Sequence, residues 1–185
     1  DGDWSSDVCS SDLYTMAFEA GEPEDIVGER FTIFFARSDD LQNWEVLPEE
    51  YNHTRDRYAA CPALRYLQGH YYMVYLEAIN EMDPTNWQLY IARSDDLVNW
   101  ELSDHNPVMA ASEDDRKIAN PRLDERCRER IESAVDINNS DFDLCEYQGK
   151  TYINYSWGNQ HGVEHLSAAM YDGPMDEFLK GWFAD

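Results

Sequence analysis

Positive charge is scarce in this chain of 185 residues. Lys and Arg together number 14 against 38 Asp and Glu, which gives a formal net charge of −24 at pH 7. Phosphate backbones are bound through Lys and Arg, so this balance argues against a nucleic-acid partner. Aromatic residues make up 14% of the chain, more than a solvated, disordered acidic segment carries. We therefore expect a packed protein that acts on a neutral substrate.

Cysteines and long apolar runs are also few. The chain has four cysteines and no Cys-x-x-Cys spacing, which indicates neither a disulfide framework nor a zinc site. No phosphate-binding or dinucleotide-binding glycine motif is present, and we expect no cofactor. Aspartate oxygens could hold Ca²⁺, but no spacing demands it. No run approaches the roughly 18 apolar residues of a membrane span, so no membrane partner is expected.

The first thirteen residues differ from the rest. Residues 3–13 read Asp-Trp-Ser-Ser-Asp-Val-Cys-Ser-Ser-Asp-Leu, with no hydrophobic period. This stretch resembles a short-read sequencing adapter translated codon by codon. We expect residues 1–13 to be an adapter-derived artefact without structure. The fold would then begin at Tyr14, inside a strand, with the natural N-terminus absent.

One ten-residue segment occurs twice, almost unchanged. Ala36–Glu45 and Ala92–Glu101 are identical at nine of ten positions and lie 56 residues apart. A repeat this close indicates one supersecondary unit used more than once. Its Ser-Asp-Asp-Leu core is typical of a turn, because Ser and Asp side chains accept hydrogen bonds from backbone N–H groups two residues further on. We expect the Leu and Trp of each copy to pack against a neighbouring sheet.

The region between the two copies contains one complete unit. Four apolar or alternating runs follow one another: Cys61–Leu67, His70–Glu77, Trp87–Arg93 and Asn99–Leu102. Alternation with aromatic and β-branched residues is typical of strands. Four such strands meandering within about 45 residues are typical of one propeller blade.

Other segments align with this unit or interrupt it. Overlaying Tyr14–Glu19 on Tyr72–Glu77 gives an earlier unit without its first strand. A helical insertion is predicted at about 112–136, with Ser112 opening a capping box and Asn120 as the N-cap of a second helix. Pro174 opens a last short helix.

A third unit follows the insertion. Aligning Gln148 with Gln68 places Asp141 and Asp143 on its first strand, with Asp141 opposite Cys61. The sequence therefore predicts an all-β fold with about three propeller blades, at about residues 14–58, 59–104 and 139–185.

These units carry a resemblance to a known group of enzymes. Blades of the form Pro-x-x-Arg-x-x-x-Gly-x-Tyr-Tyr-x-x-Tyr, followed by Arg-Ser-x-Asp-Leu-x-x-Trp, resemble the five-bladed β-propeller glycoside hydrolases of family 43 and its relatives in families 32, 117 and 130. The matching stretches are Cys61–Tyr75, Ala36–Trp44, Ala92–Trp100 and, more loosely, Asp141–Tyr155. The resemblance implies a partial five-bladed propeller without its opening blades. It also implies hydrolysis of glycosidic bonds in neutral oligosaccharides.

The resemblance further implies carboxylates where the innermost strands approach the propeller axis. Glycoside cleavage needs one carboxylic acid to protonate the leaving oxygen and a second carboxylate to activate water or to attack. Asp141 and Asp143 share one strand face, and we expect acid/base or pKa-modulating roles for them; hydrogen bonds to loop N–H groups are the alternative. Glu77 is a candidate general acid. Because Glu19 ends the same strand one unit earlier, a shared rim feature is the alternative for Glu77.

Five further residues are candidates for substrate binding. Trp157, Asn159 and His161 form a loop that combines an aromatic platform, an amide and an imidazole, which suits a sugar subsite. Arg65 ends an inward strand and could clamp a substrate group or form an ion pair between blades. Glu146 lies on the opposite face from the two aspartates, and pairing with an Arg across blades is its alternative.

Two other functions stay open at this point. Relatives usually take one catalytic carboxylate from the first blade, which this chain lacks. A non-catalytic carbohydrate-binding propeller, or a fragment inactive on its own, is therefore the alternative. Phosphorolysis ranks lower, because it needs a basic cluster and only Arg65 offers itself. The expected partner is an oligosaccharide or glycoside.

Overall fold

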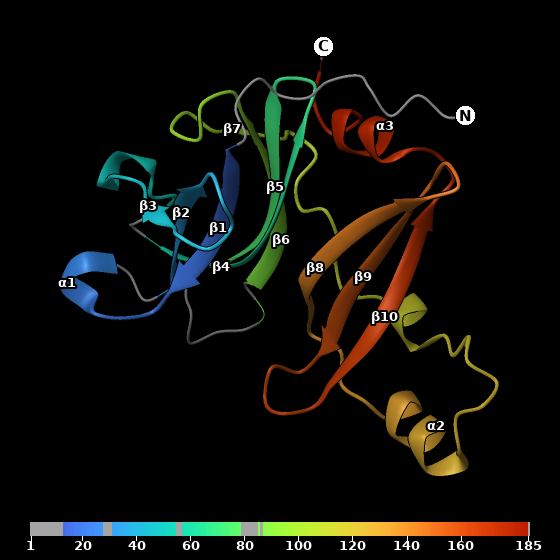
Figure 1. Cartoon of the computed structure of the whole chain (residues 1–185). Coiled ribbons are helices and arrows are strands. Elements are labelled where there is room, and N and C mark those ends of the chain that lie inside the picture. The colour runs from blue at the N-terminus through green and yellow to red at the C-terminus, as the bar shows by residue number, and fades with distance from the viewer. Residues whose placement is uncertain (1–12, 28–30, 55–56, 79–84, 86, 185) are drawn as a thin grey trace.

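The computed structural model describes residues 13–27, 31–54, 57–78, 85 and 87–184, and its strands form three antiparallel sheets (Figure 1). The first sheet has the order β1-β2-β3: β1 (Tyr14–Ala20), β2 (Thr32–Ser38) and β3 (Glu45–Val46). The second has the order β4-β5-β6-β7: β4 (Tyr58–Leu67), β5 (His70–Ala78), β6 (Trp87–Ser94) and β7 (Glu101–Leu102). The third has the order β10-β9-β8: β8 (Asn138–Tyr147), β9 (Lys150–Gly158) and β10 (Glu164–Tyr171). The prediction of an all-β fold is confirmed. Residues 1–12, nearly all of the expected adapter-derived segment, lie outside the described residues.

Apolar side chains fill the space between consecutive sheets. Ile33 and Phe35 of β2 belong to one buried cluster with Tyr75 of β5, between the first and second sheets. Leu76 of β5 belongs to a second cluster with Phe142 of β8, between the second and third sheets. Burying one such side chain contributes about 1.5–3 kcal/mol, so face-to-face packing holds the three sheets together. Successive residues of β5, such as Tyr75 and Leu76, thus pack against the first and the third sheet in turn, because side chains alternate between the two faces of a strand.

Short helices flank the sheets. They are α1 (Glu24–Val27), α2 (Glu125–Glu132), α3 (Met175–Lys180) and 3₁₀ helices at Glu49–Tyr51 and Glu113–Arg116. The predicted capping box is present at Ser112, with Asp115 as its partner. The predicted N-cap at Asn120 is wrong: Asn120 accepts a hydrogen bond within a turn (3.0 Å), and α2 begins at Glu125 because Asp124 accepts from the N–H of Cys127 (2.8 Å). None of the described helices has both the length and the apolar character that crossing a membrane requires.

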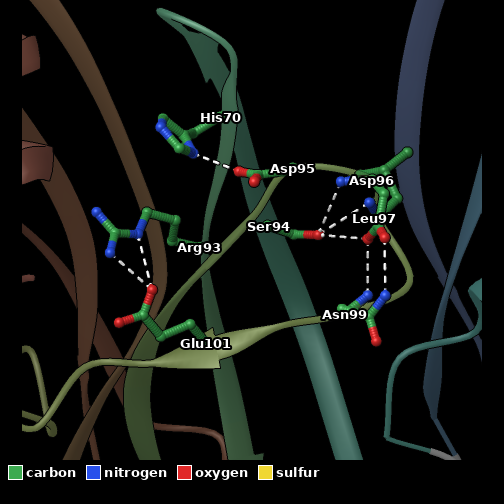
Figure 2. Close-up of polar contacts among 8 residues, drawn as sticks. All are labelled: His70, Arg93, Ser94, Asp95, Asp96, Leu97, Asn99 and Glu101. Carbon is green, nitrogen blue, oxygen red and sulfur yellow. Dashed lines mark hydrogen bonds and ion pairs between the residues drawn. The ribbon is translucent and has the colours of Figure 1, made fainter.

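The repeated segment forms the same turn in the first and second sheets. Figure 2 shows the second copy, in which Ser94 Oγ accepts from the N–H groups of Asp96 (3.2 Å) and Leu97 (2.9 Å). Asp96 in turn accepts from the N–H of Asn99 (2.8 Å), and this and further donors lower the pKa of Asp96 to about 2. In the first copy the two bonds to Ser38 Oγ have the same lengths. The turn chemistry predicted from the sequence is present in both copies.

The leucines of the two copies do not share an environment. Leu97 is fully buried and joins the cluster between the first and second sheets. Leu41 is 54% exposed, so the expectation that it packs on a neighbouring sheet is wrong. The reason is positional: Leu97 packs toward the preceding sheet, and no described sheet precedes the first one.

The register of the first sheet differs from the predicted overlay by one residue. Tyr14 pairs with Ser38, whereas in the second sheet it is Tyr71, and not Tyr72, that pairs with Ser94. Since the two serines are equivalent in the repeat, Glu19 corresponds to Leu76 and not to Glu77. A shift of one residue moves every side chain of a strand to the other face. Glu19 therefore lies on the face of β1 opposite to the one that the overlay predicted.

Candidate active site

Two β-bulges mark equivalent places on β4 and β8. The register shifts between Ala60 and Ala63 on β4 and between Ser140 and Asp143 on β8. The bulged residues Cys61 (φ 53°) and Asp141 (φ 48°) have left-handed backbones. Such conformations are costly for residues other than Gly, and bulges of this kind re-aim side chains next to active sites. Because the same irregularity occurs in two blades, we take the region around the bulges of β4 and β8 as the candidate site.

Groups from β4, β8 and β1, one strand of each sheet, meet at these bulges. The Cys61 thiol donates to Asp141 Oδ1 (3.1 Å), which joins β4 to β8. The backbone N–H of Cys61 donates to the carboxylate of Glu19 at the end of β1. Ser140 Oγ donates to the other oxygen of Asp141 (3.0 Å). Glu19 and Asp141 are both exposed, so two carboxylates lie on either side of one cysteine.

Burial and negative charge control the protonation of the cysteine. Burial raises the pKa of the Cys61 thiol most, and the charge and hydrogen bond of Asp141 and the charge of Glu19 raise it further. The thiol is therefore neutral at ordinary pH and acts as a hydrogen-bond donor.

Asp143 has a different partner from Asp141. Its Oδ1 lies 2.6 Å from Arg65 Nη2, and the same nitrogen donates to the carbonyl of Leu144 (2.6 Å). Arg65 also donates to the carbonyl of Leu64 (2.8 Å), so it ties β4 to β8. Of the two sequence-based readings of Arg65, these contacts match the ion pair between blades. The charge of Asp143 is already compensated.

Glu77 has its own partners, which differ from those of the two aspartates. Glu77 is 7% exposed, lies 2.8 Å from Arg57 Nε and accepts a hydrogen bond from the Tyr75 hydroxyl (3.0 Å). Tyr75 shares its face and belongs to the interface with the first sheet, whereas Leu76 faces the third. Glu77 therefore lies on the face of β5 that packs toward the first sheet, with its carboxylate held by Arg57 and Tyr75, and its role as a general acid stays a prediction.

Two predicted substrate-binding residues have structural partners. Trp157 is 1% exposed, lies in the core between the second and third sheets, and packs against the tilted ring of His165, with the ring centroids 4.8 Å apart. A buried indole offers no surface to a sugar, so the prediction of an aromatic platform at Trp157 is wrong. Glu146 accepts from the N–H of Met175 (2.9 Å) and so caps the start of α3.

The loop after β9 is connected to the strand that carries Asp141. Asn159 Oδ1 accepts from the N–H groups of His161 (2.8 Å) and Val163 (3.2 Å), so its oxygen is occupied by the turn, and His161 is exposed. Gln160, which the sequence did not single out, donates to Ser140 Oγ (3.2 Å). This amide thereby supports the serine that donates to Asp141.

Sequence reasoning missed Cys61 and Glu19. The alignment of Gln148 with Gln68 already placed Cys61 opposite Asp141, and this was a usable signal. Glu19 becomes recognisable only from the observed register. Among the residues that the structure describes, no group of three or more His, Cys, Asp or Glu side chains is arranged to hold a metal ion.

Comparison with known proteins finds likeness in structure. No family model matches the chain, and no curated protein matches it. A solved glycoside hydrolase superposes with a TM-score of 0.52 at 15% identity, over 88% of this chain and 46% of that one. A variant of the family 32 β-fructofuranosidase of Bombyx mori, in complex with sucrose, superposes with a TM-score of 0.53 at 17% identity, over 90% of this chain and 33% of that one.

These likenesses define the fold. The chain is a partial β-propeller with the architecture of propeller glycoside hydrolases. It spans less than half the length of either solved structure. At identities this low the likeness extends to the fold alone, and the chemistry has to be argued from the residues at the bulges.

Proposed function

We propose that this protein is a glycoside hydrolase that cleaves glycosidic bonds in neutral oligosaccharides, with Asp141 as a catalytic carboxylate. The observation that carries the proposal is the exposed Asp141 at a left-handed bulge, where β8 contacts β4 and β4 contacts β1. The propeller fold and its likeness to a sucrose-bound enzyme support a saccharide as the ligand.

Charge compensation distinguishes Asp141 from the other predicted carboxylates. Asp143 and Glu77 are each paired with an arginine. Asp141 accepts hydrogen bonds from Cys61 and Ser140 instead, and no Lys or Arg pairs with it among the described residues. A carboxylate held by neutral donors keeps its charge available for the reacting atoms, where it can take a proton from water or stabilise a positively charged transition state.

A non-catalytic carbohydrate-binding propeller is the second candidate. It is favoured by one observation: both carboxylates predicted to work with Asp141 are neutralised by arginines. Under this alternative, saccharide affinity survives Asp141→Asn and no turnover is seen at any pH.

A substrate panel separates the two functions. The purified chain would be incubated with neutral aryl glycosides and oligosaccharides, with product sugars measured by chromatography and binding by calorimetry. Asp141→Asn is expected to lower turnover by about 10²-fold or more while binding is kept. Glu45→Gln, an exposed carboxylate on β3, is the matched control and should retain full activity. Binding without turnover in the unmodified chain would reject the enzyme and leave the binding module.

A further inference from the structure

We propose that Glu19 is the second catalytic carboxylate of this site, and that Cys61 is the positioning residue that sets Glu19 opposite Asp141. This rests on the proposed function, since it supplies the partner that Asp141 needs. Glycosidic hydrolysis by carboxylates requires two of them flanking one bond.

The position of Glu19 within its sheet is the first argument. The equivalent residue in the second sheet, Leu76, is 2% exposed and packs in the interface with the third sheet. An apolar side chain at this register position therefore stabilises the packing of one blade on the next. The first sheet instead carries an exposed glutamate that points to the bulge of β4. A glutamate at a position where the fold favours a leucine loses the apolar contacts that a leucine would make. Residues that weaken packing in this way are expected at functional sites.

The backbone of the bulge is the second argument. The extra residue of a β-bulge is left out of the ladder hydrogen bonds. Cys61 lies in the bulge of β4, where it and Pro62 stand opposite one residue of β5; its N–H donates to Glu19 while its thiol donates to Asp141. One residue thus orients both carboxylates through two different groups. Among the described residues, no Lys or Arg pairs with Glu19 or Asp141.

The donors on each carboxylate assign the two roles. Both oxygens of Asp141 accept a hydrogen bond, from Cys61 and from Ser140, which complements a negative charge. Only Oε2 of Glu19 accepts from Cys61, which leaves Oε1 to carry a proton. Glu19 gives that proton to the glycosidic oxygen as its bond to the anomeric carbon breaks. Asp141 takes a proton from the water whose oxygen bonds to that carbon. Water is the co-reactant, and solvent returns the proton from Asp141 to Glu19.

Leaving-group dependence tests the role of Glu19. Glu19→Gln should lower kcat on oligosaccharides by about 10²-fold or more, yet retain most activity on nitrophenyl glycosides, whose leaving group needs no proton. Asp141→Asn should lose activity on both substrates. Glu19→Asp, which shortens the carboxylate but keeps it, should be intermediate on oligosaccharides. Circular dichroism and thermal melting confirm that each variant is folded, and Glu45→Gln is the control.

Variants of Cys61 test the positioning role. Cys61→Ser keeps a donor and should keep most of the activity, whereas Cys61→Ala should lower kcat about tenfold with KM unchanged, since small displacements of reacting groups are costly. Full activity of Glu19→Gln on oligosaccharides, together with loss in Asp141→Asn, would overturn this inference and leave the proposed function standing. An unmodified chain that turns over no glycoside would overturn both. Equal activity of the Ser and Ala variants would overturn the positioning role of Cys61.

Discussion

The pH dependence of stability that Asp136 causes tests how the helical insertion contacts the third sheet. The carboxyl group of Asp136 faces Asp115, which is 5% exposed and accepts from the Tyr155 hydroxyl (2.6 Å) and from the N–H of Ser112 (2.8 Å). Burial, and then the charge and hydrogen bond of Asp115, raise the pKa of Asp136 from 3.8 to about 6, against the opposing charge of Arg116. Asp136 is therefore protonated below that pH.

The sign of the resulting pH dependence follows from proton binding. Between about pH 4 and pH 6 the folded state holds the Asp136 proton and the unfolded chain has lost it. The free energy of unfolding therefore falls as pH rises through this window, and this contribution is constant above it. A shift of about two units corresponds to about 3 kcal/mol for a fully buried group. Asp136 is partly exposed, so we expect about 1 kcal/mol after solvent screening.

Asp136→Asn should remove this dependence. The amide has the size of the acid and donates to Asp115 at every pH, so it mimics the protonated state. The variant should be more stable than the unmodified protein by about 1 kcal/mol at pH 7.5 and equal to it near pH 4, measured by urea unfolding. Asp104→Asn, at an exposed aspartate, should show no such convergence. A difference of the same size at both pH values would refute the reasoning.

Two further results are expected. Leu97→Ala should destabilise the protein by about 2–5 kcal/mol because it empties a core site, whereas Leu41→Ala, its repeat counterpart, should stay within about 0.5 kcal/mol; equal losses in urea unfolding would contradict the packing described for the two turns. Iodoacetamide at pH 8 should alkylate Cys61 more slowly than the exposed Cys145, and Asp141→Asn should speed the Cys61 reaction alone, since it removes a charge that raises the thiol pKa. An unchanged Cys61 rate, read by peptide mass spectrometry, would contradict the thiol–carboxylate contact.

The features predicted well from sequence are those set by local hydrogen bonds. The turns at Ser38 and Ser94 follow from side chains that accept from N–H groups two or three residues away. The same holds for the capping box at Ser112. The sequence does not fix the start of α2, because Asn120 and Asp124 are both good caps and the choice between them depends on where the chain leaves its preceding turn.

The features predicted poorly depend on which sheet lies against which face. The sequence indicates a ligand platform at Trp157 because an amide and an imidazole follow it in one loop, yet in the third sheet the indole packs into the core. The short strand Tyr14–Glu19 fits the second blade in two registers, and only pairing with Ser38 decides between them. Glu77 lies on the face of β5 that packs toward the first sheet, and the sequence does not show this because both faces of β5 carry buried apolar residues.

The bulges explain why alternation alone could not assemble the site. Alternation assigns a face by counting residues, but Cys61 and Asp141 lie within the bulges of their strands, where the count is interrupted. Their left-handed backbones turn the side chains toward each other across 80 residues of sequence. The insertion also frees the N–H of Cys61 from the ladder, and that N–H is the group that holds Glu19. The same defect in two blades therefore creates both contacts of the carboxylate pair, and a regular β4 would provide neither.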